Sequence, residues 1–140
     1  MRHKFRTLTL GLLLCIAGCT QPHSPEESVQ RFYESLANPN YPELIALFNL
    51  NDLNQEPRSE AVLYEILTII FEDLALNINA KGGIEKIEFQ NATFNQDKTA
   101  ATVDYTLFFR NKTTQSDRLA LVKDHTGYWQ LQLMPAKSAN

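Results

Sequence analysis

The spacing of apolar side chains changes along this 140-residue chain, from a helical period in the first half to strand alternation in the second. The first helical stripe has the i, i+3, i+4, i+7 spacing of one helix face and consists of Val29, Phe32, Tyr33 and Leu36. A capping box with proline at the first helical position, Ser-Pro-Glu-Glu, occupies residues 24–27 just before that stripe. We therefore predict a first helix from Ser24 to about Ala37.

Two further helices are predicted before the strands begin. A short helix starts at the potential cap Asn40 and continues through Phe48, and the polar stretch at 49–58 is typical of a loop. The third helix, about Ser59 to Asn79, is the most apolar stretch of the chain beyond residue 19.

The third helix carries two apolar stripes side by side. One stripe consists of Leu63, Leu67, Ile70, Phe71, Leu74 and Ile78, and the other of Val62, Ile66, Ile69 and Leu76. So wide an apolar arc indicates cover on more than one side, and we predict a central helix gripped between the sheet and neighbouring helices. Two alternatives stay open: part of the arc is the face of a homodimer, or it is one wall of an apolar ligand cavity.

Four antiparallel strands are predicted after the Gly-Gly pair at 82–83, which suits the end of a helix. The first, Ile84 to Phe94, changes its apolar parity near Asn91, which indicates a bulge or two partly covered faces. The second, Thr99 to Arg110, alternates, with Tyr105 on its apolar side and Asp104 on the other. Two more strands cover 119–121 and 128–134. The order of elements predicts an α+β fold, with three N-terminal helices packed on a curved four-stranded antiparallel sheet.

The first eighteen residues have the composition of an export signal. Three basic residues, at positions 2, 4 and 6, precede an apolar run at 8–18 that is too short to span a bilayer. That run ends in Ile16, Ala17, Gly18 and Cys19, which resembles the lipobox of bacterial lipoproteins. The resemblance implies cleavage before Cys19, a diacylglycerol thioether on its sulfur and acylation of the new amino terminus. An ordinary secretory signal and an uncleaved anchor are the alternatives.

The lipobox gives the predicted domain organisation: a signal peptide at 1–18, a lipidated tether at 19–23 and a single α+β domain at 24–136. Thr20, rather than Asp, follows Cys19. This resembles the pattern that sends lipoproteins to the outer membrane, so we expect the protein in the bacterial cell envelope, facing the periplasm. Cys15 is removed with the signal, which leaves no free pair of cysteines for a disulfide.

Charge narrows the range of partners. After residue 18 the chain has 10 basic and 16 acidic residues, a formal charge of −6. An acidic domain without a basic patch argues against nucleic acid and against adhesion to anionic lipid heads. The lipid on Cys19 is therefore the predicted membrane anchor.

Several segments together indicate a known family. The sequence Val-Gln-Arg-Phe-Tyr at 29–33, the long third helix, the Gly-Gly pair and the sequence Gly-Tyr-Trp-Gln-Leu at 127–131 resemble small bacterial lipoproteins with a cystatin-like cone, within the nuclear transport factor 2-like (NTF2-like) superfamily. The resemblance implies a curved sheet around a long helix, with a mouth that holds an apolar ligand. The superfamily includes steroid isomerases, dehydratases, polyketide cyclases and plain binding domains, so the fold names no single function.

An enzyme of this shape needs an acid or a histidine beside a tyrosine inside the cone. The candidates are Asp104, Tyr105 and Tyr33, although strand alternation places Asp104 and Tyr105 on different faces of the sheet. The sequence contains no metal-binding His/Cys cluster, glycine-rich phosphate loop or nucleophile elbow, and we predict neither metal nor cofactor. The leading hypothesis is a non-catalytic domain that binds an envelope protein or an apolar small molecule. The alternative is an isomerase- or dehydratase-type enzyme that uses Asp104 and a tyrosine on an apolar substrate.

Overall fold

The computed structural model describes residues 24–51 and 60–133, which form three helices and five strands. The elements are α2 (Pro25–Ala37), α3 (Tyr41–Ala46), β1 (Phe48–Asn49), α4 (Glu60–Ala80), β2 (Ile84–Phe94), β3 (Ala100–Phe109), β4 (Thr114–Lys123) and β5 (Trp129–Gln132). The predicted signal peptide, the tether and Cys19 lie outside the described residues. No helix in the described ranges has the length and apolar character needed to cross a membrane.

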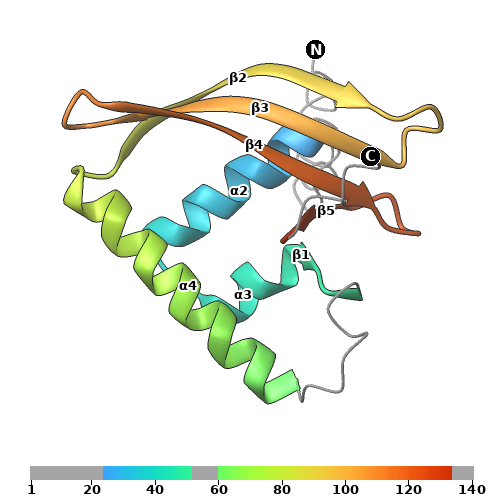
Figure 1. The fold of residues 1–140 in the computed structure, drawn as a ribbon, viewed down its shortest axis with the longest axis horizontal. Helices are drawn as coiled ribbons and strands as arrows, with labels where there is room; N and C mark the ends of the chain where they lie inside the picture. The colour runs from blue at the N-terminus through green and yellow to red at the C-terminus, as the bar shows by residue number, and fades with distance from the viewer. Residues whose placement is uncertain (1–23, 52–59, 134–140) are drawn as a thin grey trace, which may run out of the picture.

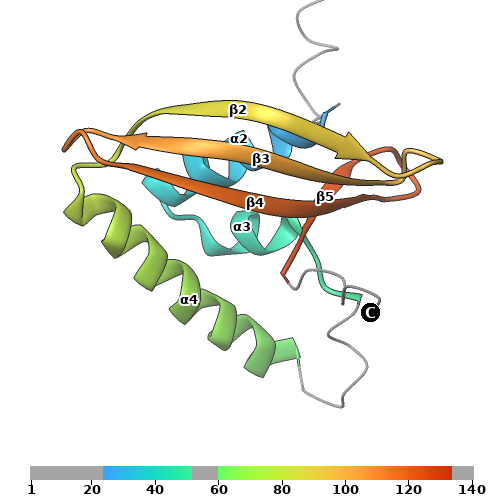
Figure 2. The ribbon, with the colours of Figure 1, turned by 45° about the horizontal axis from the view of Figure 1, so that its top comes forward.

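The strands form one curved sheet in the order β1-β5-β4-β3-β2, with α2, α3 and α4 all on the same side of it (Figures 1 and 2). Strands β2 to β5 pair antiparallel with their sequence neighbours, as we predicted for the four strands after the glycine pair. The predicted α+β class is therefore confirmed.

The sheet has a fifth strand that the sequence did not predict. We expected the second helix to continue through Phe48, but α3 ends at Ala46, and the prediction of four strands was wrong. After Ala46 the backbone becomes extended, because the Leu47 carbonyl accepts a hydrogen bond from the Leu131 amide at 2.8 Å. Phe48 then pairs with Leu131 in the only parallel strand pair among the described residues.

The first helix begins where its capping box predicted. The Ser24 side chain accepts a hydrogen bond from the Glu27 amide at 3.2 Å, and Pro25 opens the helix. The helix buries the whole predicted stripe together with Ser28, which is 0% exposed. The Ser28 hydroxyl donates to the Trp129 carbonyl at 2.7 Å, so one buried hydrogen bond joins α2 to β5.

Strand alternation decides which side chains face the helices. Along β3 the odd positions are buried and the even positions are partly exposed, as predicted. The predicted bulge in β2 is confirmed by a register shift between Phe89 and Asn91, and a second shift lies between Ile84 and Lys86.

The prediction of a gripped central helix was wrong. Helix α4 packs on α2 and α3 with one face and diverges from the sheet toward its N-terminal end (Figures 1 and 2). Its buried residues are Leu67, Phe71, Ala75 and Ile78. The second stripe is exposed, from 39% at Ile66 to 68% at Leu76. The covered arc is therefore narrower than the apolar arc, since most of the surface of Ile69 and Leu76 remains exposed.

A glycine pair fixes the angle at which α4 meets the sheet. Gly82 and Gly83 have φ of 86° and 87°, and their amides donate to the last carbonyls of α4, at Asn79 and Ile78. A side chain at Gly82 would also come within 3.2 Å of the Arg110 Cβ. Only glycine suits this position without strain.

We expect Ser28→Ala to lower the free energy of unfolding by about 1–2 kcal/mol, because the Trp129 carbonyl loses a buried donor. Ser35→Ala is the matched control on the same helix, since the Ser35 hydroxyl makes no hydrogen bond within the described residues. Urea unfolding of the two variants measures the difference. Equal stability of both variants would contradict the role given to this bond.

Candidate functional site

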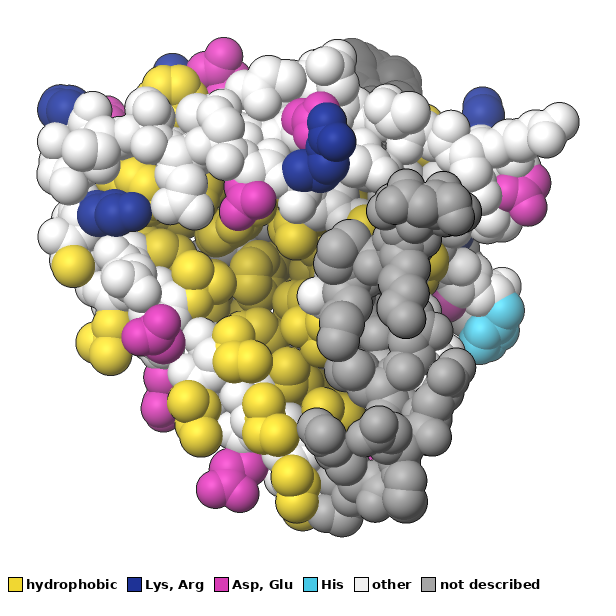
Figure 3. Space-filling model, viewed as in Figure 1, with side chains coloured by type: hydrophobic (Ala, Val, Ile, Leu, Met, Phe, Trp, Pro, Cys, Tyr) yellow, Lys and Arg dark blue, Asp and Glu magenta, His cyan; other side chains and the backbone are white. Residues whose placement is uncertain are grey.

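A hollow of about 240 Å³ lies between α4 and the concave face of the sheet, and we call it the groove. Figure 3 shows apolar side chains gathered in this hollow between the sheet and α4. Its apolar lining comes from α2, β1, α4 and the strands, and includes Phe32, Phe48, Ile70, Phe71, Leu74 and Leu107. The polar lining consists of Asn77, Lys81, Gln115, Asp117 and Gln132. The groove is thus an apolar surface with a few polar side chains, which is the usual make-up of a small-molecule site.

An aromatic cluster at the base of the groove holds α4 in place. The ring of Phe32 lies 5.4 Å from that of Phe48 and 5.8 Å from that of Phe71, both edge to face. Phe48 and Phe71 stack at 5.4 Å. These three rings come from α2, β1 and α4, so the cluster attaches α4 by one face and leaves the gap toward β4 unfilled.

Two tyrosine hydroxyls meet beside the groove. The hydroxyl oxygens of Tyr33 on α2 and Tyr105 on β3 are 2.7 Å apart, so one O–H donates to the other. Tyr33 is 7% exposed and Tyr105 is 1% exposed, and both line the groove. Burial raises the pKa of Tyr33 to about 12 and raises the pKa of Tyr105 still further. Both hydroxyls therefore keep their protons at neutral pH.

Asp104 lies on the other face of the sheet. Its carboxylate accepts two hydrogen bonds from Arg118, at 2.5 Å from Nε and 3.2 Å from Nη2. The hydrogen bond from Arg118 lowers the pKa of Asp104 below its usual value, and the charge of Arg118 acts in the same direction. Of the three catalytic candidates, the structure brings Tyr33 and Tyr105 together and separates Asp104 from them, as strand alternation indicated.

Asp117 is the acidic residue that faces the groove, and sequence analysis missed it. It is the cross-strand neighbour of Tyr105, and its charge contributes to the raised pKa of both tyrosines. The sequence predicted this strand only over 119–121, whereas β4 begins at Thr114, so residue 117 was not assigned to a face. Continuing that alternation backward from Leu121 and Leu119 places residue 117 on the same face.

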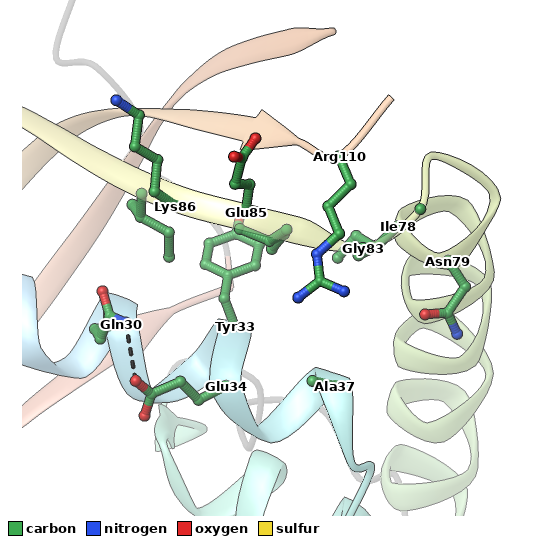
Figure 4. Close-up of a pocket in the computed structure, with 13 residues that line it drawn as sticks. Gln30, Tyr33, Glu34, Ala37, Ile78, Asn79, Gly83, Glu85, Lys86 and Arg110 are labelled. Atoms are coloured by element: carbon green, nitrogen blue, oxygen red, sulfur yellow. Dashed lines mark hydrogen bonds between the residues drawn. The ribbon is translucent and has the colours of Figure 1, made fainter. Parts of the chain in front are cut away.

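A second hollow, of about 360 Å³, lies on the other side of Tyr33 and Ile78, which line both hollows. Figure 4 shows the Arg110 guanidinium between Tyr33 and α4, while Glu34 accepts a hydrogen bond from Gln30 at 2.8 Å. The lining of this second hollow carries more charge, from Glu34, Glu85, Lys86 and Arg110, whereas the groove has only Lys81 and Asp117 among its apolar side chains.

Metal chemistry has no candidate residues in the part of the chain that the structure describes. Within residues 24–51 and 60–133, no three His, Cys, Asp or Glu side chains come together in a way that could hold an ion. His125 is exposed in the turn between β4 and β5.

Comparison with known proteins supports the fold and no more. No protein-family model matches the chain, and no curated protein sequence matches it. A provisionally assigned NTF2-like transpeptidase from Campylobacter jejuni has a similar structure, with a TM-score of 0.66 and 20% identity over 79% of this chain and 99% of that one. A cystatin-like protein of unknown function from Methylobium petroleophilum matches at a TM-score of 0.42 and 12% identity, over 86% of this chain and 84% of that one. The fold is NTF2-like, as the sequence resemblance implied.

We expect alkaline pH to destabilise the protein through the tyrosine pair. The pKa values of both tyrosines in the folded protein lie above the ordinary 10.0. The stability that the protonated pair contributes is therefore complete below pH 10 and is lost as the pH rises toward 12. The slope is about 1.4 kcal/mol per pH unit for each tyrosine once the unfolded chain ionises. Urea unfolding between pH 9 and 12 measures this slope, which we expect to be smaller in the Tyr33→Phe/Tyr105→Phe double variant. The same slope in both proteins would show that the pair does not cause it.

Proposed function

We propose that this protein is an envelope lipoprotein, anchored by the lipid on Cys19, whose domain binds an apolar small molecule in the groove without catalysis. The observation that carries the proposal is the groove itself, an open apolar hollow beside a helix that is attached by one face.

The size and lining of the groove favour a small ligand. Its volume of about 240 Å³ is just below the roughly 300–1,000 Å³ of most ligand pockets, which suits a small molecule or the apolar part of a larger one. Ile70 lines the groove and is 49% exposed, so an occupant would remove apolar surface from water at the mouth. Burial of such surface is worth about 25 cal/mol per Å².

The anchor and the binding site are close along the chain. Cys19 precedes the first residue of α2, Pro25, by six positions, so a lipid on its sulfur would hold the domain near the membrane surface. An apolar ligand dissolves in that membrane better than in water. The tether would therefore keep the groove where such a ligand is concentrated.

One observation favours the enzyme as a second candidate function. Asp117 is on the groove side of β4, opposite Tyr105, so the groove holds a carboxylate and tyrosine hydroxyls together. An enzyme with an apolar substrate would use Asp117 as its acid–base group in place of Asp104. A carrier returns its ligand unchanged, whereas this enzyme would convert it.

We expect Cys19→Ser to abolish incorporation of radiolabelled palmitate into the protein in a bacterial host, because the thioether has no sulfur to form on. Cys15→Ser is the matched control, since Cys15 lies in the predicted signal peptide. That variant should be labelled like the unaltered protein. Labelling of the Cys19→Ser protein would refute the anchor site.

The groove is tested with 2-ethylnaphthalene, an apolar probe with no polar atom. The protein is the chain from residue 19 to 140 with Cys19→Ser, which includes every described element and needs no detergent. We expect Ile70→Glu to weaken binding at least tenfold, since binding would bury an unpaired carboxylate. The control is Ile69→Glu, because Ile69 is 59% exposed on the same helix but does not line the groove.

Binding is followed by titration of the probe fluorescence. The proposal requires the Ile69→Glu protein to bind like the unaltered one. No measurable binding by the unaltered protein, or equal weakening by the two substitutions, would place the apolar site elsewhere or remove it.

A further inference from the structure

Helix α4 carries apolar side chains on the side that faces away from the core. Ile66, Ile69 and Leu76 are all exposed there, and we call these three residues the outer stripe. At 3.6 residues per turn, their positions lie opposite the buried face that packs on α2 and α3. No residue of the outer stripe lines the groove or the second hollow. The outer stripe is therefore a separate surface of the molecule.

The spacing of the outer stripe is that of a contact between two helices. In a heptad that begins at Ile66, the side chains of Ile66 and Ile69 occupy the a and d positions. The next heptad has Asp73 at its a position and Leu76 at its d position. A second helix packed along α4 would meet these four residues in its first layer of contacts, and Asp73 would be the charged one among them.

The charges beside the outer stripe are acidic. Glu65 and Glu72 occupy the g positions that flank it, and both are exposed, as is Asp73. None of these three carboxylates forms an ion pair within the described residues, and the sequence of α4 contains no lysine or arginine. Figure 3 shows acidic side chains next to apolar ones along the outer edge of α4. The complement of this surface is an apolar helix face with basic side chains beside it.

A second copy of α4 fits the outer stripe poorly. An antiparallel pair centred on Ile69 would bring Glu65 against Asp73 of the other copy, and a parallel pair would bring the two Asp73 side chains together at an a position. Like charges oppose both arrangements. The negative charge of an anionic lipid surface would meet the same repulsion. The charge pattern therefore favours a different protein as the partner.

We propose that the outer stripe of α4 binds one amphipathic helix of a second protein, which has apolar side chains at its a and d positions and lysine or arginine beside them. Contact between the apolar side chains removes the outer stripe from water, and the basic side chains pair with Glu65, Glu72 and Asp73. This interaction is separate from ligand binding in the groove, because the two surfaces share no residue.

The test uses two synthetic peptides of three heptads, each with isoleucine at a, leucine at d and alanine at b, c and f. One peptide has lysine at e and g, and the other has glutamate there. Fluorescence anisotropy of the labelled peptides measures their binding to the chain from residue 19 to 140 with Cys19→Ser. We expect the lysine peptide to bind at least tenfold more tightly than the glutamate peptide, because only its charges are opposite to those of α4.

Two variants separate the contributions of charge and apolar contact. Glu65→Lys/Glu72→Lys should reverse the preference, so that the glutamate peptide binds more tightly. Ile69→Ser should weaken binding of the lysine peptide at least fivefold. Its matched control is Tyr64→Ser, because Tyr64 is also an exposed apolar residue of α4 but occupies an f position outside the outer stripe. Circular dichroism checks that every variant keeps the helix content of the unaltered protein.

Several outcomes would overturn the inference. They are no binding of the lysine peptide by the unaltered protein, equal binding of the two peptides, a lysine preference that survives the charge reversal, and equal weakening by Ile69→Ser and Tyr64→Ser. A dimer in sedimentation that Ile69→Ser dissociates would assign the outer stripe to a second copy. Binding to phosphatidylglycerol vesicles that Ile69→Ser abolishes would assign it to a membrane surface, and either result overturns the proposed partner.

Discussion

The attachment of α4 by a single face is the constraint on which the rest of this structure depends. Phe71 packs against Phe32 and Phe48, and the glycine pair at 82–83 sets the direction in which the helix leaves the sheet. If α4 lay flat on β4, its apolar face would fill the space that now forms the groove. The aromatic cluster therefore both stabilises the fold and keeps the site open.

Local signals in the sequence predicted most of the fold. The capping box at 24–27, the alternation of β3 and the parity change near Asn91 all correspond to observed features, because each depends on residues close together in the chain. The fifth strand could not be predicted in this way. Phe48 becomes extended through a hydrogen bond between Leu47 and Leu131, and no local pattern records a contact over that separation.

The position of α4 escaped prediction for a different reason. Two apolar stripes indicate how much of the surface of a helix is suited to burial, but not which part of the protein buries it. Ile69 and Leu76 are 59% and 68% exposed, which leaves the homodimer face as an open alternative. Its acidic neighbours affect that alternative: an antiparallel pair of α4 helices centred on Ile69 would bring Glu65 against Asp73 of the second copy, and like charges oppose such pairing.

The tyrosines of the candidate site were predicted from the sequence, but the acidic residue that lines the groove was not. Tyr33 and Tyr105 were recognised as candidates, but their contact joins α2 to β3 and follows only from the packed fold. Asp104, the acidic candidate taken from the sequence, is paired with Arg118 on the outer face, while Asp117 is the cross-strand neighbour of Tyr105. The carboxylate of Asp104 does not line the groove, so without Asp117 the lining would contain no carboxylate. Asp117 gives the groove one carboxylate, whose charge opposes an anionic ligand and adds to the larger effect of burial in raising the pKa of both tyrosines.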